Sequence, residues 1–166
     1  MSRTRRHIEQ NPKNREAIFM LGAPASGKST VARIRYPNAF FIDPDEYKKL
    51  HPLYDPKDPS KVHQWSAKKA QSAFSDALAN RDSPLVVDGT GTNSERLVYQ
   101  MNKARSEGYR IILLFVVASL KTCLKRNHKR ERSVSDTLVI SKYETVGTSF
   151  QLVAPYADDV IVIRTD

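Results

Sequence analysis

The segment from Gly22 to Ser29 has the residue types and the spacing of a phosphate-binding loop. It reads GAPASGKS and fits the pattern G-x-x-x-x-G-K-[ST] at every fixed position. In such a loop the glycines let backbone N–H groups point at phosphate oxygens, the lysine reaches the β- and γ-phosphates, and the serine hydroxyl binds magnesium. The sequence therefore predicts a site for ATP or another NTP with Mg²⁺, formed by Gly22, Ala23, Pro24, Ala25, Ser26, Gly27, Lys28, Ser29 and Thr30.

Two aspartates follow the second apolar run of the chain. Asp43 and Asp45 come directly after residues 39–42 and are separated by Pro44. In open α/β sheets the carboxyl ends of the strands line the ligand crevice, so both carboxylates are expected beside the bound triphosphate. An alternative interpretation makes Asp45 a plain N-cap for a helix over residues 46–50.

A third aspartate, Asp88, ends another apolar run and begins the segment Asp-Gly-Thr-Gly-Thr-Asn. P-loop proteins hold a magnesium-linked carboxylate at such a strand end, which makes Asp88 a candidate metal ligand together with Ser29. Binding of the acceptor is an equally good interpretation, and the spacing does not choose between them. Thr92 or Asn93 is expected to cap the helix that follows.

Positive charge is dense between residues 120 and 132. A phosphoryl group in transfer spreads negative charge over its equatorial oxygens, and a guanidinium placed there stabilises that charge. Arg126 and Arg130 are four residues apart, so on a helix they share a face and can reach the phosphates together. The alternative is a solvated cationic face.

The elements that must position these residues alternate between apolar strands and helices. Strands are expected at 17–21, 39–42, 84–87, 110–117 and 158–163, and helices at 29–34, 46–50, 61–81, 94–106 and around 139–153. This alternation is typical of a parallel sheet with right-handed crossovers. We predict an α/β fold, a three-layer sandwich with a five-stranded parallel sheet and a helical basic lid, in one domain over 17–166. Residues 1–16 are predicted to be a flexible basic arm.

The net charge, the lengths of the apolar runs and the cysteine count indicate the kind of partner and the location to expect. The formal net charge of +9 favours a polyanionic partner such as nucleic acid, and a generally basic surface is the alternative. No apolar run approaches the roughly 20 residues that span a bilayer, and no apolar region follows the basic N-terminus, so neither a membrane partner nor export is expected. The single cysteine, Cys123, agrees with a reducing compartment, and we expect a cytoplasmic location.

These motifs together resemble the P-loop kinases that include bacteriophage polynucleotide kinase and the zeta toxins. The similarity runs from about Phe19 onward and includes the loop itself, the segment IDPDEYK after the second strand and the lid segment LKRNHKR. The resemblance implies the P-loop kinase fold and makes Asp45 the general base. It also implies that Lys48 lies near an acceptor phosphate and that Arg126 and Arg130 contact the transferred phosphates.

The acceptor side is similar to both groups. The Asp-Gly-Thr-Gly segment resembles the Glu-Gly-Thr-Gly of zeta toxins, whereas Asn93 and the three residues after it resemble the polynucleotide kinase. Residues 51–63 do not match the polynucleotide kinase well. The resemblance implies acceptor contacts from Asp43, Lys48, Asp88, Thr90 and Asn93.

The expected activity is Mg²⁺-dependent transfer of the γ-phosphoryl group of ATP to a hydroxyl on nucleic acid. That hydroxyl is a 5′ end, or the hydroxymethyl group of a modified base in phage-type DNA, which would place the enzyme in the host cytoplasm. The alternatives are a zeta-toxin-like kinase of UDP-N-acetylglucosamine and an NTP-binding module without catalysis. DNA or RNA, the donor base and the oligomeric state stay open.

Overall fold

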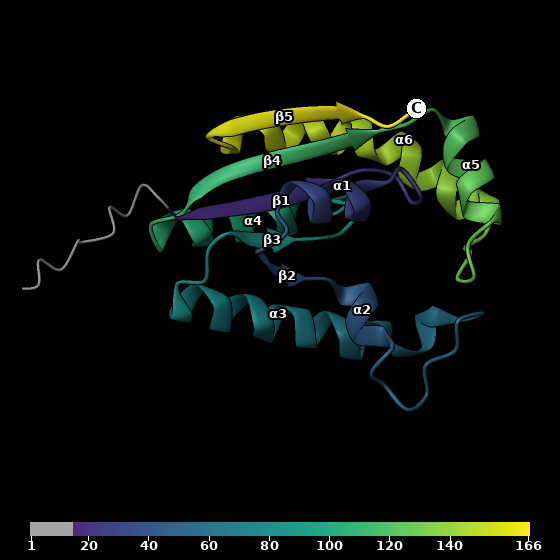
Figure 1. Ribbon diagram of the computed structural model, residues 1–166, viewed down its shortest axis with the longest axis horizontal. Coiled ribbons are helices and arrows are strands. Elements are labelled where there is room, and N and C mark those ends of the chain that lie inside the picture. The colour runs from purple at the N-terminus through teal and green to yellow at the C-terminus, as the bar shows by residue number, and fades with distance from the viewer. Residues whose placement is uncertain (1–14) are drawn as a thin grey trace, which may run out of the picture.

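The computed structural model describes residues 15–166, so the expected basic arm lies outside it except for its last two residues. Five parallel strands form one sheet in the order β2-β3-β1-β4-β5 (Figure 1). They are β1 (Glu16–Leu21), β2 (Phe40–Ile42), β3 (Leu85–Val87), β4 (Arg110–Val117) and β5 (Asp159–Arg164). The predicted five-stranded parallel sheet is confirmed.

Helices join these strands. They are α1 (Lys28–Arg35), α2 (Pro44–Lys48), α3 (His63–Asn80), α4 (Ser94–Ser106), α5 (Leu120–His128) and α6 (Asp136–Val153), with 3₁₀ turns η2 (Pro59–Val62) and η3 (Ala154–Tyr156). In the part of the chain that the structure describes, no helix is long and apolar enough to cross a membrane.

Each face of the sheet has its own core because side chains alternate along a strand. One face packs against α3, α4 and α6, where the ring of Phe74 meets that of Phe19 edge-on with centroids 6.3 Å apart. The other face packs against α1, whose Ala32 is fully buried among Ile18, Met20 and Leu114. The layers are therefore helix, sheet and helix, as the sequence predicts.

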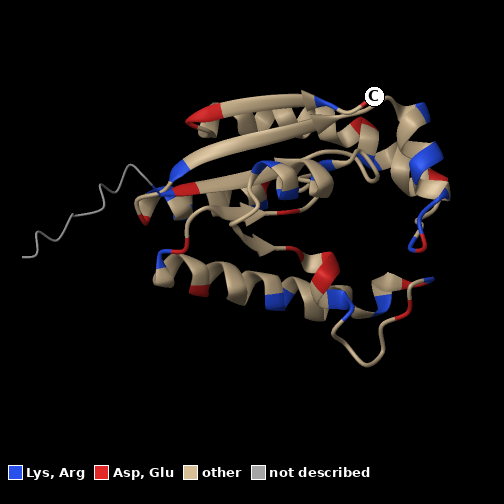
Figure 2. Cartoon of the chain, in the orientation of Figure 1, with Lys and Arg blue, Asp and Glu red and all other residues tan. Residues whose placement is uncertain are grey.

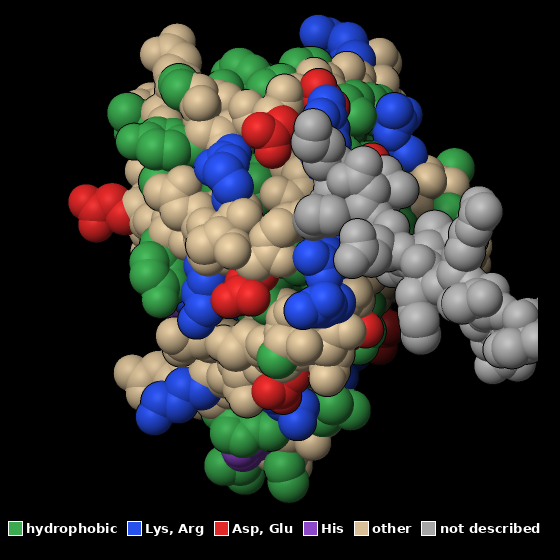
Figure 3. Space-filling model, turned by 90° about the vertical axis from the view of Figure 1, so that its left-hand side faces the viewer, with side chains coloured by type: hydrophobic (Ala, Val, Ile, Leu, Met, Phe, Trp, Pro, Cys, Tyr) green, Lys and Arg blue, Asp and Glu red, His purple; other side chains and the backbone are tan. Residues whose placement is uncertain are grey.

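The charged residues of interest gather where the strands end. Figure 2 shows acidic residues after β2 and β3 and a concentration of Lys and Arg on α5 and the loop that follows it. At the opposite end of the molecule, where the strands begin, side chains of both signs are interspersed with hydrophobic ones (Figure 3). The topology thus brings the chemistry-bearing residues to the carboxyl ends of the parallel strands.

Two local expectations were wrong. Asp43, not Asp45, is the N-cap of α2: its Oδ1 accepts a hydrogen bond from the Asp45 amide at 2.9 Å. The helix begins two residues earlier than expected because Pro44, with its fixed φ, is well suited to the first helical position. The apolar spacing along residues 61–81 also predicts Trp65 in the core, yet it is 37% exposed and contacts His51 and Lys69 instead.

Candidate active site

The loop between β1 and α1 folds tightly against the end of β4. Ala25 and Gly27 both have left-handed backbone conformations, with φ of 62° and 93°. A Cβ at Gly22 would lie 2.8 Å from the carbonyl oxygen of Val116, so the close approach requires glycine. α1 then begins at Lys28 and directs its free N–H groups and positive dipole end toward the loop. The backbone therefore has the shape of a phosphate cradle.

A cavity of about 540 Å³ opens in front of this loop. Most of the residues predicted from the sequence line it: Pro24, Ala25, Gly27, Lys28, Ser29, Thr30, Asp43, Asp45, Lys48, Asp88, Thr90, Arg126 and Arg130. The structure adds residues that the sequence did not single out: Ser60, His63, Arg132, Val134, Leu138 and Lys142.

The other predicted residues lie around the cavity rather than on it. Gly22 contributes its amide, which donates to the Thr90 carbonyl at 3.2 Å and ties the phosphate loop to the segment after β3. Ala23 and Ser26 are buried behind the loop. Asn93 accepts a hydrogen bond from the Arg96 amide at 3.1 Å and caps α4, as the sequence predicts. Its predicted acceptor contact stays a prediction.

The residues present fit a magnesium site. The Ser29 hydroxyl donates to Asp88 Oδ2 at 2.7 Å, and Asp88 is only 7% exposed. Asp43 faces the same region, and burial, followed by the charges of Asp88 and Asp45, raises its pKa to about 6. Such a crowded group of carboxylates favours a cation between them. Mg²⁺ usually takes its remaining ligands from phosphates and water.

Lys28 extends from the start of α1 into this acidic region. Burial lowers the pKa of its ammonium, and the neighbouring Asp88 opposes that effect. A buried ammonium is stabilised by anions, because they replace the water that it loses. Lys28 is therefore placed to favour bound phosphate.

Asp45 lies in the first turn of α2 and forms two ion pairs. Its carboxylate is 2.8 Å from Arg132 Nη2 and 3.4 Å from Lys48 Nζ. Burial by itself would raise the pKa of Asp45, but the hydrogen bond and charge of Arg132, with help from Lys48, lower it to about 2. In this arrangement the carboxylate is a weak base.

Arg132 reaches Asp45 because of the turn that follows α5. Asn127 is fully buried, and its side chain donates to the Val134 carbonyl at 2.7 Å and accepts from the Val134 amide at 3.1 Å. These two bonds fold residues 128–134 back over the cavity. From the sequence, Arg132 is only one member of a basic segment, and its contact with Asp45 is not predicted. Asn127 is the one residue nearby whose type could have indicated the turn.

The cavity wall opposite the phosphate loop is cationic. Lys48 is only 8% exposed, and burial lowers the pKa of Lys142, an effect that the nearby Lys48 and Arg132 strengthen. Burial and Lys48 also lower the pKa of His63. The spacing along residues 61–81 predicts a solvated face for His63, and nothing in the sequence distinguishes Lys142, because both residues lie on helices with an ordinary packing pattern.

The two lid arginines differ in position. Arg130 is exposed at the end of the lid and lines the cavity. Arg126 also lines it, but its guanidinium donates to the carbonyl oxygens of Ser26 and Thr165. Their predicted contacts with transferred phosphates stay predictions.

Comparison with known proteins identifies a family. The model of the family described as Zeta toxin matches residues 2–166. A search of curated proteins found no significant match.

Solved structures share the fold at low sequence identity. A chain of the PezAT toxin-antitoxin system of Streptococcus pneumoniae aligns over 92% of this chain and 69% of its own length, with a TM-score of 0.67 and 18% identity. The AvrRxo1-ORF1:ORF2 complex with ATP aligns over 87% of this chain and 51% of the other, with a TM-score of 0.68 and 16% identity.

The Pnkp1/Rnl/Hen1 RNA repair complex aligns over 82% of this chain and 45% of the other, with a TM-score of 0.64 and 18% identity. This chain thus spans about half the length of the AvrRxo1 and RNA repair chains. At these identities the similarity shows the fold alone.

Proposed function

The chain belongs to the zeta toxin family and has the P-loop kinase fold, and we propose that it transfers the γ-phosphoryl group of ATP to a hydroxyl of a phosphate-bearing acceptor. The acceptor proposed first is a nucleotide sugar of the UDP-N-acetylglucosamine type. The observation that supports it best is the cationic wall opposite the phosphate loop.

On that wall three cations surround one carboxylate. Lys48 and Arg132 both pair with Asp45, and Lys142 interacts with the same group at longer range. Positive charge therefore remains after Asp45 is neutralised. Because burial makes each uncompensated charge costly, an acceptor that brings its own phosphates would be favoured here.

The donor side of the proposed reaction is formed by the loop. Its amides and Lys28 would hold the β- and γ-phosphates, and Ser29 with Asp88 would hold Mg²⁺. When bound, Mg²⁺ would supply positive charge that stabilises the transferred phosphoryl group. Arg130 and Arg132 both line the cavity, and their guanidiniums could stabilise the transferred group.

The proposed general base is Asp45, which lies between the two halves of the cavity. While Arg132 is paired with it, its pKa of about 2 makes it a poor proton acceptor. We propose that the donor phosphates draw Arg132 away, since they offer the guanidinium more negative charge than a single carboxylate does. Asp45 would then orient the acceptor hydroxyl and accept its proton.

A nucleic-acid hydroxyl is the second candidate acceptor. The net charge of +9 and the basic lid favour it, because many phosphate contacts would use such charge. Part of that charge lies in residues 1–14, outside the described part of the chain.

The test is a transfer assay with γ-labelled ATP and Mg²⁺. UDP-N-acetylglucosamine, a 5′-hydroxyl oligonucleotide and hydroxymethyl-base DNA are offered in parallel, each with the unchanged chain and with Asp45→Asn. Label on the sugar nucleotide alone supports the first candidate, and label on an oligonucleotide, weakened strongly by salt, supports the second. Asp45→Asn is expected to reduce transfer by about a hundredfold or more while ATP still binds.

Two results would contradict the proposal. If no acceptor becomes labelled although ATP binds, the non-catalytic module becomes the better interpretation. If Asp45→Asn transfers at the unchanged rate, Asp45 is not the base.

A further inference from the structure

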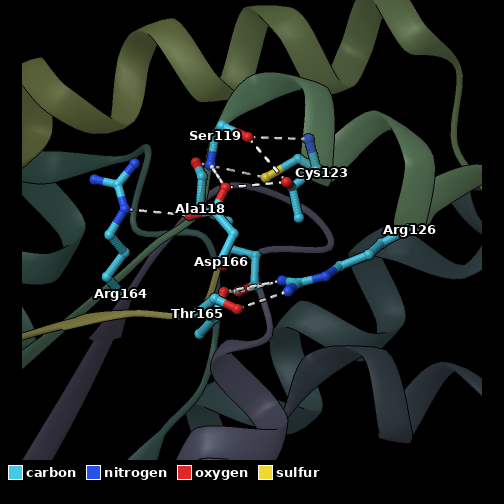
Figure 4. A network of polar contacts seen from close by, with 9 residues as sticks. Ala118, Ser119, Cys123, Arg126, Arg164, Thr165 and Asp166 are labelled. Atoms are coloured by element: carbon cyan, nitrogen blue, oxygen red, sulfur yellow. Dashed lines mark hydrogen bonds and ion pairs between the residues drawn. The ribbon is translucent and has the colours of Figure 1, made fainter.

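Arg126 joins three segments that are far apart in the sequence (Figure 4). Its Nη1 donates to the Ser26 carbonyl at 3.1 Å and to the Thr165 hydroxyl at 2.9 Å, and its Nη2 donates to the Thr165 carbonyl at 2.9 Å. The Thr165 hydroxyl itself donates to the same Ser26 carbonyl at 2.7 Å. The lid helix α5, the phosphate loop and the segment after β5 are thus held together.

These bonds fix one peptide unit of the phosphate loop. The peptide group is planar and trans, so the carbonyl of Ser26 and the amide of Gly27 point in opposite directions. With the Ser26 carbonyl held by Arg126 and Thr165, the Gly27 N–H must point away from them. Gly27 has a left-handed φ of 93° and lines the cavity, and it directly precedes the helix start that binds phosphate.

The Thr165 side of this contact is firmly anchored. The Thr165 amide donates to the Val117 carbonyl at 2.9 Å. The next residue, Asp166, accepts hydrogen bonds from the Ser119 amide at 2.8 Å and from the Thr122 hydroxyl at 3.0 Å, at the N-terminus of α5. Thr165 is therefore fixed to β4 and to the lid helix before it contacts the loop.

We propose that Arg126 and Thr165 are positioning residues that hold the phosphate loop in its ATP-binding shape. The proposal rests on the proposed function only in taking ATP as the ligand of the loop. It differs from the sequence prediction, which gives Arg126 a direct contact with the transferred phosphates. Three of the hydrogen bonds that the guanidinium can donate are directed at protein oxygens instead.

Thr165→Val tests the proposal without changing Arg126. It preserves side-chain shape and retains the guanidinium of Arg126. It removes one of the two hydrogen bonds to the Ser26 carbonyl and also the bond that the Thr165 hydroxyl accepts from Arg126 Nη1. We expect Mg-ATP binding, measured by calorimetry, to weaken by about threefold to tenfold, with kcat and the KM of the acceptor within about twofold. Thr165→Ser retains the hydroxyl and should restore binding.

The matched control is Thr145→Val. Its hydroxyl also donates to a backbone carbonyl, that of Ser141 at 2.9 Å, but within α6 and away from the loop. It should bind ATP as the unchanged chain does. The thermal midpoint of each variant shows whether it is folded.

A double-mutant cycle with Arg126→Ala tests whether the two residues act together on the phosphate loop. Because both residues hold the same carbonyl, the combined loss of ATP affinity should be smaller than the product of the two single losses. Unchanged ATP affinity in Thr165→Val would overturn this proposal and leave the proposed function intact. So would a double variant whose loss of ATP affinity equals the product of the two single losses. Absence of ATP binding in the unchanged chain would instead overturn the proposed function and this proposal with it.

Discussion

Removing Arg132 should raise the pKa of Asp45 and yet lower the rate of transfer. The side chains of Arg132 and Asp45 are 2.8 Å apart, and this pair is the main cause of the low pKa of about 2. Arg132→Met removes the charge and retains apolar length. Burial, which raises the pKa, is then opposed mainly by Lys48. We expect the pKa of Asp45 to rise from about 2 toward its ordinary value of 3.8.

The size of this rise can be checked against Coulomb's law. Two unit charges about 4 Å apart interact by roughly 1 kcal/mol in water and roughly 4 kcal/mol at an effective dielectric constant of about 20. Since one pKa unit corresponds to about 1.36 kcal/mol, the range is about one to three pKa units. The Asp45 side chain is 49% exposed, so solvent screening places the expected rise in the lower half of that range.

The assay is a pH titration of the Asp45 carboxyl by ¹³C NMR in the absence of nucleotide. Arg110→Met is the matched control, because it makes the same chemical change in an ion pair with Asp159 at the other end of the sheet. If the pKa of Asp45 stays near 2 in Arg132→Met, or rises equally in Arg110→Met, the assignment of its cause is wrong.

The transfer rate of Arg132→Met shows whether the higher basicity of Asp45 or the loss of the guanidinium has the larger effect. Asp45 becomes a better base, which by itself would favour proton transfer. A guanidinium on the transferred phosphoryl group, however, is worth on the order of a thousandfold or more, and base catalysis on the order of a hundredfold to ten thousandfold. A base that is already ionised at neutral pH gains little from a higher pKa. We therefore expect kcat to fall by about a hundredfold or more, and an unchanged or higher kcat would contradict the proposed role of Arg132.

Three further predictions concern the acceptor wall, the acidic region and the lid turn. Lys142→Met should raise the KM of a phosphate-bearing acceptor by about fivefold to thirtyfold with ATP affinity unchanged, whereas Lys103→Met on α4 should change neither in steady-state kinetics. Asp43 has a folded-state pKa of about 6, above its ordinary 3.8, so its stabilising contribution is complete below pH 3.8 and is lost as the pH rises through 6. The thermal midpoint of the ligand-free chain minus that of Asp43→Asn should therefore decrease as the pH rises from 3.8 to 6. A difference that does not change with pH would contradict the raised pKa of Asp43. Asn127→Ala leaves both backbone groups of Val134 without their partner, so denaturant titration should show a loss of about 1–3 kcal/mol in unfolding free energy.

The sequence predicts the donor side of the site well because that side is built from local motifs. The loop fixes its own backbone through glycines and the helix that follows, and apolar runs mark the strand ends that carry Asp43 and Asp88. A parallel sheet then places these ends at the same edge whatever the strand order is. The order β2-β3-β1-β4-β5 itself was not predicted, since it depends on which strand edges pair.

The acceptor side could not be predicted in the same way because it is assembled by tertiary contacts. Lys142 lies on α6, whose apolar spacing indicates only packing, and His63 lies at the start of α3. Both face the cavity because of how their helices dock against the sheet. The capping residue of α2 was also misassigned, and that error matters: with Asp43 as the cap, the Asp45 side chain is free to pair with Arg132.

Arg132 connects the two sides of the cavity, and this suggests an order of events. The Arg132 side chain is only 18% exposed, and a largely buried guanidinium that loses its carboxylate partner carries an energetic cost. Arg132 can therefore leave Asp45 only when another anion, such as a donor phosphate, replaces it. Asp45 in turn becomes available to an acceptor hydroxyl at that point, with Lys48 still beside it. In the absence of ATP the base would remain paired, which would limit reaction of a bound acceptor until the donor is in place.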